Sequence, residues 1–398
     1  AVPKLVCAAS HINDCFAAFD LLHEADGDCI ALCMGQAGLI SRVLAKKLGG
    51  LVTFASLDEA SGTAPGQVTL DAFKGLYHHD SMDRDTELFG VIADPVGHSL
   101  SPAIHNACLA DEGINGVYLP LLVQGGRDGL FTFLDNVLAR PWLGFRGFSV
   151  TIPHKHSALD YVRQKGGFVE PLVEQIGAAN TLVVERQAAG RASSLAGDCR
   201  ARTHDLQHDR AGCKRDGGMS QIAAYNTDYA GALDAIAAGM GIVRDGFRDM
   251  PVAVVGAGGV SRAVVAGLTD AGAKVTIYNR TIERAEQLAA DFHCAYSGLD
   301  GLANLDAKLI VNGTSIGMHP TVDATPVPPE VLRPDMAVFD TVYNPAETLL
   351  LKHAKAAGAR TIDGLAMFVN QARAQFHLFT GHPANPTLMR EVVLASLR

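Results

Sequence analysis

The sequence of 398 residues is poor in charged side chains, has no long apolar run and has no regular spacing of its cysteines. Charged residues make up 19%, below the usual quarter, and apolar residues make up 48%, which indicates deep cores rather than disorder. No apolar run reaches the roughly 18 residues of a membrane span. We therefore expect two or three globular domains and no membrane partner.

The cysteines and the net charge indicate the cellular compartment and the classes of partner to expect. Because the eight cysteines are scattered, at positions 7, 15, 29, 33, 108, 199, 213 and 294, no disulfide framework is indicated and a reducing, cytoplasmic setting is expected. A net charge of −9 argues against a nucleic-acid partner, although local cations still allow small anionic ligands. No signal peptide is recognised. Because the chain does not begin with Met, we expect it to start inside a longer protein.

Alternating apolar runs and helical stretches divide the chain into blocks. The first block alternates strand and helix patterns three times, which predicts a piece of a parallel sheet or barrel. A polar linker follows it, then two further α/β blocks and a last amphipathic stretch that we expect to pack back on the second block. The predicted ranges are 1–77, 78–87, 88–240, 241–364 and 365–398.

Residues 186–220 differ from the rest of the second block. They are rich in Arg, Gly, Ala, Ser and Asp, so we expect an exposed, flexible insert between two strands. Within it lie Cys199, His204, His208 and Cys213, which are ligand types that Zn²⁺ accepts. Their spacing is not that of a known finger, so a chance cluster is the favoured interpretation and no metal is predicted.

PVAVVGAGGVSRAVVAGL (251–268) predicts a buried strand, a glycine turn and a helix. Gly256 permits the tight turn. Ala257, Gly258 and Gly259 let backbone N–H groups approach a pyrophosphate at the helix N-terminus. The spacing is G-x-G-G rather than G-x-G-x-x-G, and the alternative is a tight turn that binds nothing.

The next strand, KVTIYNRTIER (274–284), carries the cofactor preference. An acidic residue at its end would grip the ribose hydroxyls of NAD. Asn279, Arg280, Thr281 and Arg284 stand there instead, and guanidinium groups suit a 2′-phosphate. The sequence therefore predicts NADP; the alternative is a helix start whose arginines only face water.

Six motifs, in order, resemble those of shikimate dehydrogenases from about residue 85 to the C-terminus. They are VGHSLSPAIHN (96–106), GFRGFSVTIPHK (144–155), IGAANTL (176–182), AAYNTDYAGA (223–232), NGTSIGM (312–318) and GLAMFVNQA (364–372). The resemblance implies a three-layer substrate domain and a Rossmann-like NADP domain. It also implies reduction of the carbonyl of 3-dehydroshikimate, with shikimate as product.

The resemblance also assigns roles to residues. Lys155 would deliver a proton to the carbonyl oxygen, and Asp228 would hold Lys155, which is the arrangement that ketone reduction needs. Ser99 and Ser101 would bind the substrate carboxylate. The other implied contacts are Thr151, Asn180 and Gln371 to ring hydroxyls, Tyr343 to close the pocket, and Thr314 and Gly364 to the cofactor. A relative that prefers quinate and a non-catalytic nucleotide-binding scaffold remain the alternatives.

The first block resembles the last part of type I 3-dehydroquinate dehydratase, a (β/α)8 barrel that forms a Schiff base. On this resemblance Lys4 is the Schiff-base lysine, Arg42 binds the substrate carboxylate, and Thr63 and Gln67 line the site. Only about three of eight βα units are present, so no dehydratase activity is expected from this chain alone. A fusion of the two enzymes is typical of plants, which makes a plastid the alternative location.

Overall fold

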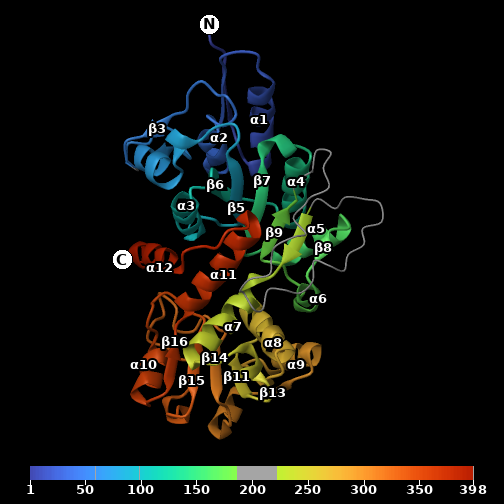
Figure 1. The fold of residues 1–398 in the computed structure, drawn as a ribbon, viewed down its shortest axis with the longest axis vertical. Helices are drawn as coiled ribbons and strands as arrows, with labels where there is room; N and C mark the ends of the chain where they lie inside the picture. The colour runs from blue at the N-terminus through green and yellow to red at the C-terminus, as the bar shows by residue number, and fades with distance from the viewer. Residues whose placement is uncertain (59, 98, 186–221, 398) are drawn as a thin grey trace.

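The structure, a computed structural model, describes residues 1–58, 60–97, 99–185 and 222–397. Three lobes follow one another in the order of the sequence (Figure 1). An N-terminal block lies at one end, a parallel six-stranded sheet lies at the other, and a mixed six-stranded sheet lies between them. The α/β class with a partial barrel in front is confirmed. The expected insert and its Cys and His residues lie outside the described residues.

The described part of the N-terminal block contains two short pairs of parallel strands. Strand β1 (Lys4–Ala8) pairs with β2 (Ile30–Met34), and β3 (Ala55–Ser56) pairs with β4 (Val68–Thr69). All five residues of β1 are exposed, so β1 is an open edge. The helical segments are η1 (Ile12–Asp14), α1 (Cys15–Glu24), η2 (Gln36–Gly38), α2 (Leu39–Val43), η3 (Ala72–Leu76) and η4 (His79–Ser81).

One hydrophobic core joins this block to the middle lobe. The ring of Phe16 on α1 lies 5.9 Å from that of Phe133, and both are buried in the same cluster. Met82, in the segment between the lobes, is 3% exposed and belongs to that cluster. At the rim, Arg140 donates two hydrogen bonds of 2.6 Å to the Asp20 carboxylate. The two lobes therefore share their interior.

The middle lobe is built on a sheet with the order β6-β5-β7-β9-β10-β8. Strand β9 runs antiparallel to both neighbours, and the other pairs are parallel. Its strands are β5 (Glu87–Ala93), β6 (Gly116–Leu122), β7 (Phe145–Val150), β8 (Phe168–Val169), β9 (Thr181–Val184) and β10 (Ile222–Tyr225). Its helices are α3 (Ser101–Asp111), α4 (Gly126–Leu138), η5 (Pro141–Leu143), α5 (Lys155–Gln164) and α6 (Pro171–Ile176).

The last lobe is a doubly wound sheet with the order β13-β12-β11-β14-β15-β16, and all its pairs are parallel. In chain order this is 3-2-1-4-5-6, the arrangement of dinucleotide-binding folds. Its strands are β11 (Pro251–Val255), β12 (Lys274–Tyr278), β13 (Ala295–Ser297), β14 (Leu309–Asn312), β15 (Ala337–Asp340) and β16 (Arg360–Ile362). Its helical segments are η6 (Arg244–Phe247), α8 (Gly259–Asp270), α9 (Ile282–Phe292), η7 (Leu299–Asn304), η8 (Pro329–Val331) and α10 (Leu349–Ala356).

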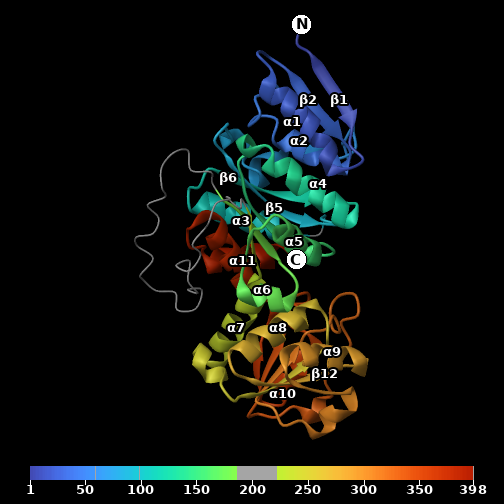
Figure 2. The ribbon, with the colours of Figure 1, turned by 90° about the vertical axis from the view of Figure 1, so that its right-hand side faces the viewer.

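Helices α7 (Thr227–Met240) and α11 (Gly364–Thr380) pack together where the two sheets meet (Figures 1 and 2). Helix α7 also contacts α8, and α11 also contacts β7, so the pair touches both lobes. The final helix, α12 (Pro386–Ser396), packs against α3 of the middle lobe. Within the described ranges, no helix combines the length and apolar character needed to cross a bilayer.

Candidate active site

Lys155 and Asp228 come together where the middle lobe meets α7. Strand β7 ends at Val150, and a short turn leads to Lys155 as the first residue of α5. Asp228 lies in the first turn of α7, whose N-terminus is capped by the Asn226 side chain. Lys155 Nζ donates a 2.6 Å hydrogen bond to Asp228 Oδ2, and the two side chains are 28% and 13% exposed. The ammonium is thus held in place but still accessible to a ligand.

The side chain of Asn180 holds the other oxygen of the Asp228 carboxylate. Asn180 Nδ2 donates to Asp228 Oδ1 at 2.9 Å and to Thr227 Oγ1 at 3.0 Å, while Asn180 Oδ1 accepts from the Thr227 backbone N–H at 2.7 Å. Thr227 Oγ1 lies 3.5 Å from Gln371 Oε1 on α11. Four residues expected from the sequence, Lys155 included, therefore form one connected cluster, and Thr227 joins them.

A buried chain of hydrogen bonds lies behind this cluster and was not predicted from the sequence. Tyr118 OH donates to Ser149 Oγ at 2.7 Å, and Ser149 Oγ donates to Gln375 Oε1 at 2.7 Å. Gln375 Nε2 then donates to the backbone oxygen of Asn180 at 3.3 Å. Burial raises the pKa of Tyr118, and hydrogen bonds with Ser149 and Ser101 oppose that rise. The chain links Ser101, at the N-terminus of α3, to the loop of Asn180.

The remaining expected substrate residues of the middle lobe follow β5 and β7: Ser99 and Thr151 lie on loops, and Ser101 is the first residue of α3. Ser99 and Ser101 follow β5 and are half-buried, and the Ser101 backbone N–H donates to Ser99 Oγ at 3.3 Å. Thr151 follows β7 directly and is half-buried. Because β5 and β7 are parallel neighbours, their carboxyl ends meet at one edge of the sheet. Ser99, Ser101 and Thr151 therefore lie at the same edge as Lys155.

The glycine turn lies at the crevice of the doubly wound sheet, between β11 and β14, where the strand order reverses. Gly256 has φ +109°, and a Cβ there would approach Thr314 Cγ2 to 2.7 Å, so the fold itself requires this glycine. A Cβ on Gly258 or Gly259 would meet nothing within 4 Å. Space is therefore open beside these two residues, and Ala257 is half-buried between Gly256 and Gly258.

The residues expected to recognise a 2′-phosphate lie at the carboxyl end of β12. Asn279 Nδ2 donates to the backbone oxygen of Thr281 at 2.7 Å, which orders the turn into α9. Arg280 and Arg284 are exposed, and among the described residues neither guanidinium lies within ion-pairing distance of a carboxylate. The two guanidinium groups therefore remain available to a ligand within the described structure, which fits an anionic ligand group.

A buried polar cluster behind the crevice was also not predicted. Asn312 Oδ1 accepts hydrogen bonds from Thr314 Oγ1 at 2.7 Å and from Thr314 N at 2.9 Å, while Asn312 Nδ2 donates to Asp340 Oδ1 at 2.9 Å. Burial raises the pKa of Asp340, and a hydrogen bond from Thr348 opposes that rise. This cluster fixes the loop that carries Thr314.

Tyr343 and Gly364 join the crevice to α11. Tyr343 follows β15 and stacks on Phe368 of α11, with ring centroids 4.8 Å apart. Gly364 is the first residue of α11, and a Cβ there would lie 2.5 Å from the backbone oxygen of Val342. Any larger residue at position 364 would push α11 away from the loop of Tyr343.

The expected dehydratase residues are not joined by one hydrogen-bond network within the described structure. Lys4 Nζ lies 4.3 Å from the ring centroid of Phe54. Thr63 Oγ1 and the Thr63 N–H both donate to Gln67 Oε1, at 3.2 and 2.8 Å. Arg42 is 2% exposed, and burial lowers its pKa. Among the described residues, no hydrogen bond or ion pair joins Lys4 to the other three.

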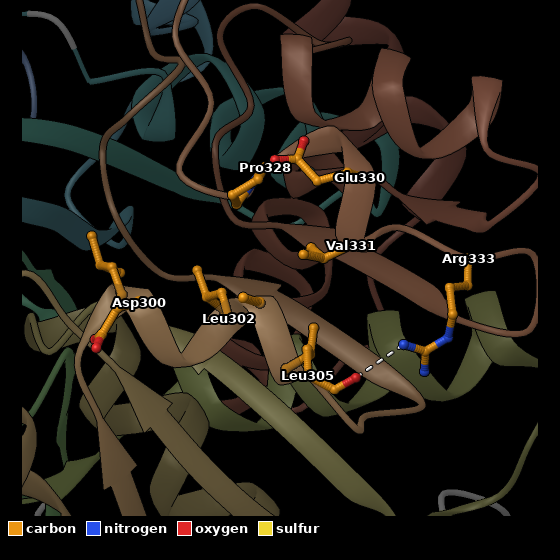
Figure 3. A pocket seen from close by; sticks show the side chains of 9 residues that line it. Asp300, Leu302, Leu305, Pro328, Glu330, Val331 and Arg333 are labelled. Atoms are coloured by element: carbon orange, nitrogen blue, oxygen red, sulfur yellow. Dashed lines mark hydrogen bonds between the residues drawn. The ribbon is translucent and has the colours of Figure 1, made fainter.

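A hollow of about 390 Å³ lies elsewhere in the last lobe, between η7 and η8 (Figure 3). Its lining includes Asp300, Leu302 and Arg333, and Arg333 donates to the backbone oxygen of Leu305 at 2.9 Å. Leu305 and Arg333 precede β14 and β15, whereas the glycine turn follows the carboxyl end of β11. The hollow therefore does not belong to the dinucleotide crevice.

A doubly wound sheet with an open glycine turn, beside a lysine–aspartate cluster on a separate lobe, defines a two-domain, dinucleotide-dependent oxidoreductase. The chain is 37% identical over 322 residues to the NADP⁺ shikimate dehydrogenase of Methanosarcina acetivorans, a match that covers 78% of the chain and 99% of that relative. The chain belongs to the shikimate dehydrogenase family.

Matches to family descriptions divide the chain in the same way. Residues 91–182 match "Shikimate dehydrogenase substrate binding domain", residues 242–318 match "Shikimate / quinate 5-dehydrogenase", and residues 364–394 match "Shikimate 5'-dehydrogenase C-terminal domain". Residues 1–84 match "Type I 3-dehydroquinase".

One further relative matches nearly the whole chain, and one solved structure has a similar fold. The bifunctional 3-dehydroquinate dehydratase/shikimate dehydrogenase, chloroplastic, of Arabidopsis thaliana is 36% identical over 404 residues. That match covers 98% of this chain but 60% of the relative, so the chain spans less than two thirds of its length. A crystal structure of the Thermus thermophilus shikimate dehydrogenase with NADP(H) and shikimate superposes with a TM-score of 0.60 at 32% identity, covering 78% of this chain and all of that one.

Proposed function

We propose that the chain catalyses the NADPH-dependent reduction of 3-dehydroshikimate to shikimate. The observation that carries the proposal is the ion pair of Lys155 with Asp228, braced by Asn180 at the edge of the middle sheet. An ammonium held by a carboxylate, yet partly exposed, suits proton delivery to a ketone oxygen. Family membership makes this reaction the first to test.

In the proposed mechanism, different side chains deliver the proton, orient the proton donor and bind the substrate. NADPH supplies the hydride when it is bound. Lys155 donates a proton to the carbonyl oxygen as negative charge develops there, and Asp228 keeps the ammonium oriented. Ser99 and Ser101 hold the ring carboxylate.

Thr151, Asn180 and Gln371 bond the ring hydroxyls, and Tyr343 covers the ring. These polar groups fix one orientation of a small hydroxylated acid, as a specific pocket requires. Each of these roles is a proposal that rests on the placement of the side chains at one edge of the middle lobe and on α11.

The residues that would hold NADP are proposed from the crevice. Gly256 to Gly259 would take the pyrophosphate at the N-terminus of α8. The group at the carboxyl end of β12, from Asn279 to Arg284, would take the 2′-phosphate. Thr314 and Gly364 would border the nicotinamide side of the crevice. The open space beside Gly258 and Gly259 is the supporting observation.

One assay separates the candidate reactions. Oxidation of shikimate or of quinate is followed through the absorbance of the reduced nicotinamide, with NADP⁺ or NAD⁺ as acceptor. We expect the highest kcat/KM with shikimate and NADP⁺. A higher value with quinate would make the chain a quinate dehydrogenase, and no turnover with either acid would leave a non-catalytic scaffold.

We propose further that the N-terminal block alone has no dehydratase activity, and that residues 1–77 and 88–240 act as one folded body while 241–364 binds NADP. Borohydride trapping with 3-dehydroquinate should leave Lys4 unmodified, because among the described residues no hydrogen bond or ion pair joins Lys4 to the other expected site residues. For the cell, a cytoplasmic location, or a plastid in a plant source, is proposed; the name of the Arabidopsis relative supports the plastid.

A further inference from the structure

Three cysteine side chains converge in the N-terminal block, outside the site described above. Cys7 on β1 and Cys33 on β2 are direct partners in the parallel pair, and their Sγ atoms lie 3.2 Å apart. Cys15, on α1, forms a hydrogen bond to Cys33. All three are free thiols, and Cys15 and Cys33 are buried whereas Cys7 is exposed.

We propose that Cys7 and Cys33 form a redox-active pair, which a small oxidised disulfide such as oxidised glutathione converts into a disulfide bond. Neighbouring parallel strands lie about 4.8 Å apart, within the span of Cα atoms that a disulfide bridges. Because the two residues are register partners, their side chains leave the same face of the strand pair. The sulfur atoms are therefore already adjacent without a change in register.

The environments of the two sulfurs assign them different roles. Hydrogen bonds from Cys15, and also from Cys7, lower the pKa of Cys33. Burial and the neighbouring Cys33 raise the pKa of Cys7. The lower pKa gives Cys33 the greater thiolate character of the two. Since Cys7 is exposed and Cys33 is not, a reagent reaches Cys7 first.

The chemistry proceeds in two exchanges. Cys7 Sγ attacks one sulfur of oxidised glutathione as its proton passes to Cys33; a Cys7–glutathione bond forms, and glutathione thiolate leaves and takes the proton from Cys33. Cys33 Sγ then attacks Cys7 Sγ, the mixed disulfide breaks, and a second glutathione thiolate leaves. The two cysteines are oxidised by two electrons, and one glutathione disulfide is reduced to two thiols.

The position of the pair gives the bond a structural consequence. Strand β1 is exposed at all five residues and pairs with β2 alone among the described strands. A bond between Cys7 and Cys33 would tie this open edge to the rest of the block. Lys4, three residues before Cys7, leaves the opposite face of β1 and would stay unmodified.

Metal binding is the competing use of clustered thiols. Among the described residues, no group of three or more His, Cys, Asp or Glu side chains is arranged to hold a metal ion. Geometry therefore favours the thiol exchange, for which two sulfurs are sufficient.

The test uses the full chain, incubated with oxidised glutathione and then alkylated, with intact mass and peptide mapping as readouts. We expect the loss of two hydrogen atoms, a crosslinked peptide pair containing Cys7 and Cys33, and full reversal by dithiothreitol. Peptide mapping distinguishes this pair from the other cysteines. In urea, where the proximity is lost, the preference for this pair should disappear.

Three variants make the outcome decisive. Cys33→Ser should accumulate glutathione on Cys7, because the second exchange is blocked. Cys7→Ser should give no crosslink, and Cys108→Ser, which changes a buried thiol of α3, should crosslink like the unchanged chain. A stable glutathione adduct on Cys7 of the unchanged chain, or a dominant crosslink between other cysteines, overturns the proposal. Dehydrogenase activity reports separately that each variant is folded.

Discussion

The carboxylate of Asp228 divides its two oxygens between Lys155 Nζ and Asn180 Nδ2. This fork fixes both the ammonium and the amide relative to the edge of the middle sheet. A substitution of Lys155 should therefore affect chemistry more than folding, because its side chain is 28% exposed. A substitution of Asn180, which is 2% exposed, should affect both.

Replacing Lys155 by Met should lower kcat by about 10²- to 10⁴-fold, the usual contribution of a positioned proton donor, with a small change in the KM for shikimate. Steady-state kinetics measures both. The matched control is Lys165→Met, because Lys165 also pairs with a carboxylate at 2.6 Å, that of Asp135. A near-normal kcat for the Lys155 variant would remove it from the mechanism.

Replacing Tyr118 by Phe removes only the hydroxyl that donates to Ser149. Because the buried chain links Ser101, at the N-terminus of α3, to the loop of Asn180, the KM for shikimate should rise by several-fold while the KM for NADPH stays constant. The control is Tyr161→Phe, which removes a hydroxyl that donates to Asp135 at 2.7 Å. Both variants should lose about 1–3 kcal/mol of stability. If the two variants have the same KM for shikimate, Tyr118 has only a structural role.

The His105 imidazole gives a pH dependence of stability. Burial lowers the pKa of His105 to about 3, well below its ordinary value of 6.5. Between these values the unfolded chain binds a proton that the folded chain does not, so stability should fall as pH falls from about 6.5 to 3, by about 1.4 kcal/mol per pH unit. Denaturant titrations at several pH values should show that this loss of unfolding free energy at low pH is absent in His105→Phe. It should be retained in His377→Gln, because His377 is exposed.

The order of the sequence motifs identified Lys155, Asp228, Asn180 and Gln371 as candidate site residues, because each lies next to a strand or on a helix that carries one of the motifs. Tyr118 and Gln375 could not be found in the same way. A tyrosine within an apolar strand, such as Tyr118, is interpreted as part of the hydrophobic core. For Gln375 the sequence offers one weak indication, its position one helical turn after Gln371. Polar networks between segments distant in sequence leave no local pattern.

At the level of secondary-structure elements, the turn from β12 into α9 is the proposed site of the preference for NADP. Changing Arg280 to Asp should raise the KM for NADPH by about tenfold or more, because a charge-assisted bond to the 2′-phosphate becomes a repulsion. The KM for NADH should change far less.

The comparison requires a control arginine on the same lobe. Arg248→Asp alters the net charge equally at another exposed position. Equal effects on NADPH and NADH, or equal effects of the two substitutions, would contradict a 2′-phosphate site at Arg280.

Four strands of the last lobe, β11, β12, β14 and β15, were predictable because each is a short, mainly apolar run, whereas β13 and β16 are short and largely exposed. In the N-terminal block, the observed strands and helices are shorter than the alternating sequence pattern predicts. Of the three strand and helix patterns expected there, the third strand spans only Ala55–Ser56 and the second helix, α2, spans only Leu39–Val43. Short elements are held by tertiary contacts, which periodicity does not reveal.

On the scale of the whole molecule, the N-terminal block and the middle lobe should unfold together. Phe16→Ala should destabilise the middle lobe by about 3–5 kcal/mol, because Phe16 fills the shared core. The single tryptophan, Trp142, stacks on His23 across the interface at 3.9 Å and reports the transition by fluorescence. Leu21→Ala, on the same helix but 38% exposed, is the control. Two separate transitions would show independent lobes.

The shared core could not be predicted, since it joins segments that the sequence separates by a polar stretch. Residues 78–87 read as a linker because most of their side chains are polar. Met82 is nevertheless buried among apolar residues of both lobes, and Lys47 Nζ donates to the backbone oxygen of Arg84 at 2.8 Å. Composition alone does not distinguish a polar connection that packs from one that does not.

The antiparallel pairing of β9 with β10 has a practical consequence. Val184 and Ile222 are register partners, so the chain leaves the sheet and returns to it at a single point. A segment whose two ends are fixed side by side can be exchanged for another with closely spaced termini at little cost to the sheet. This position is therefore a natural place to graft a reporter domain onto the enzyme, so that its folding can be followed in a living cell.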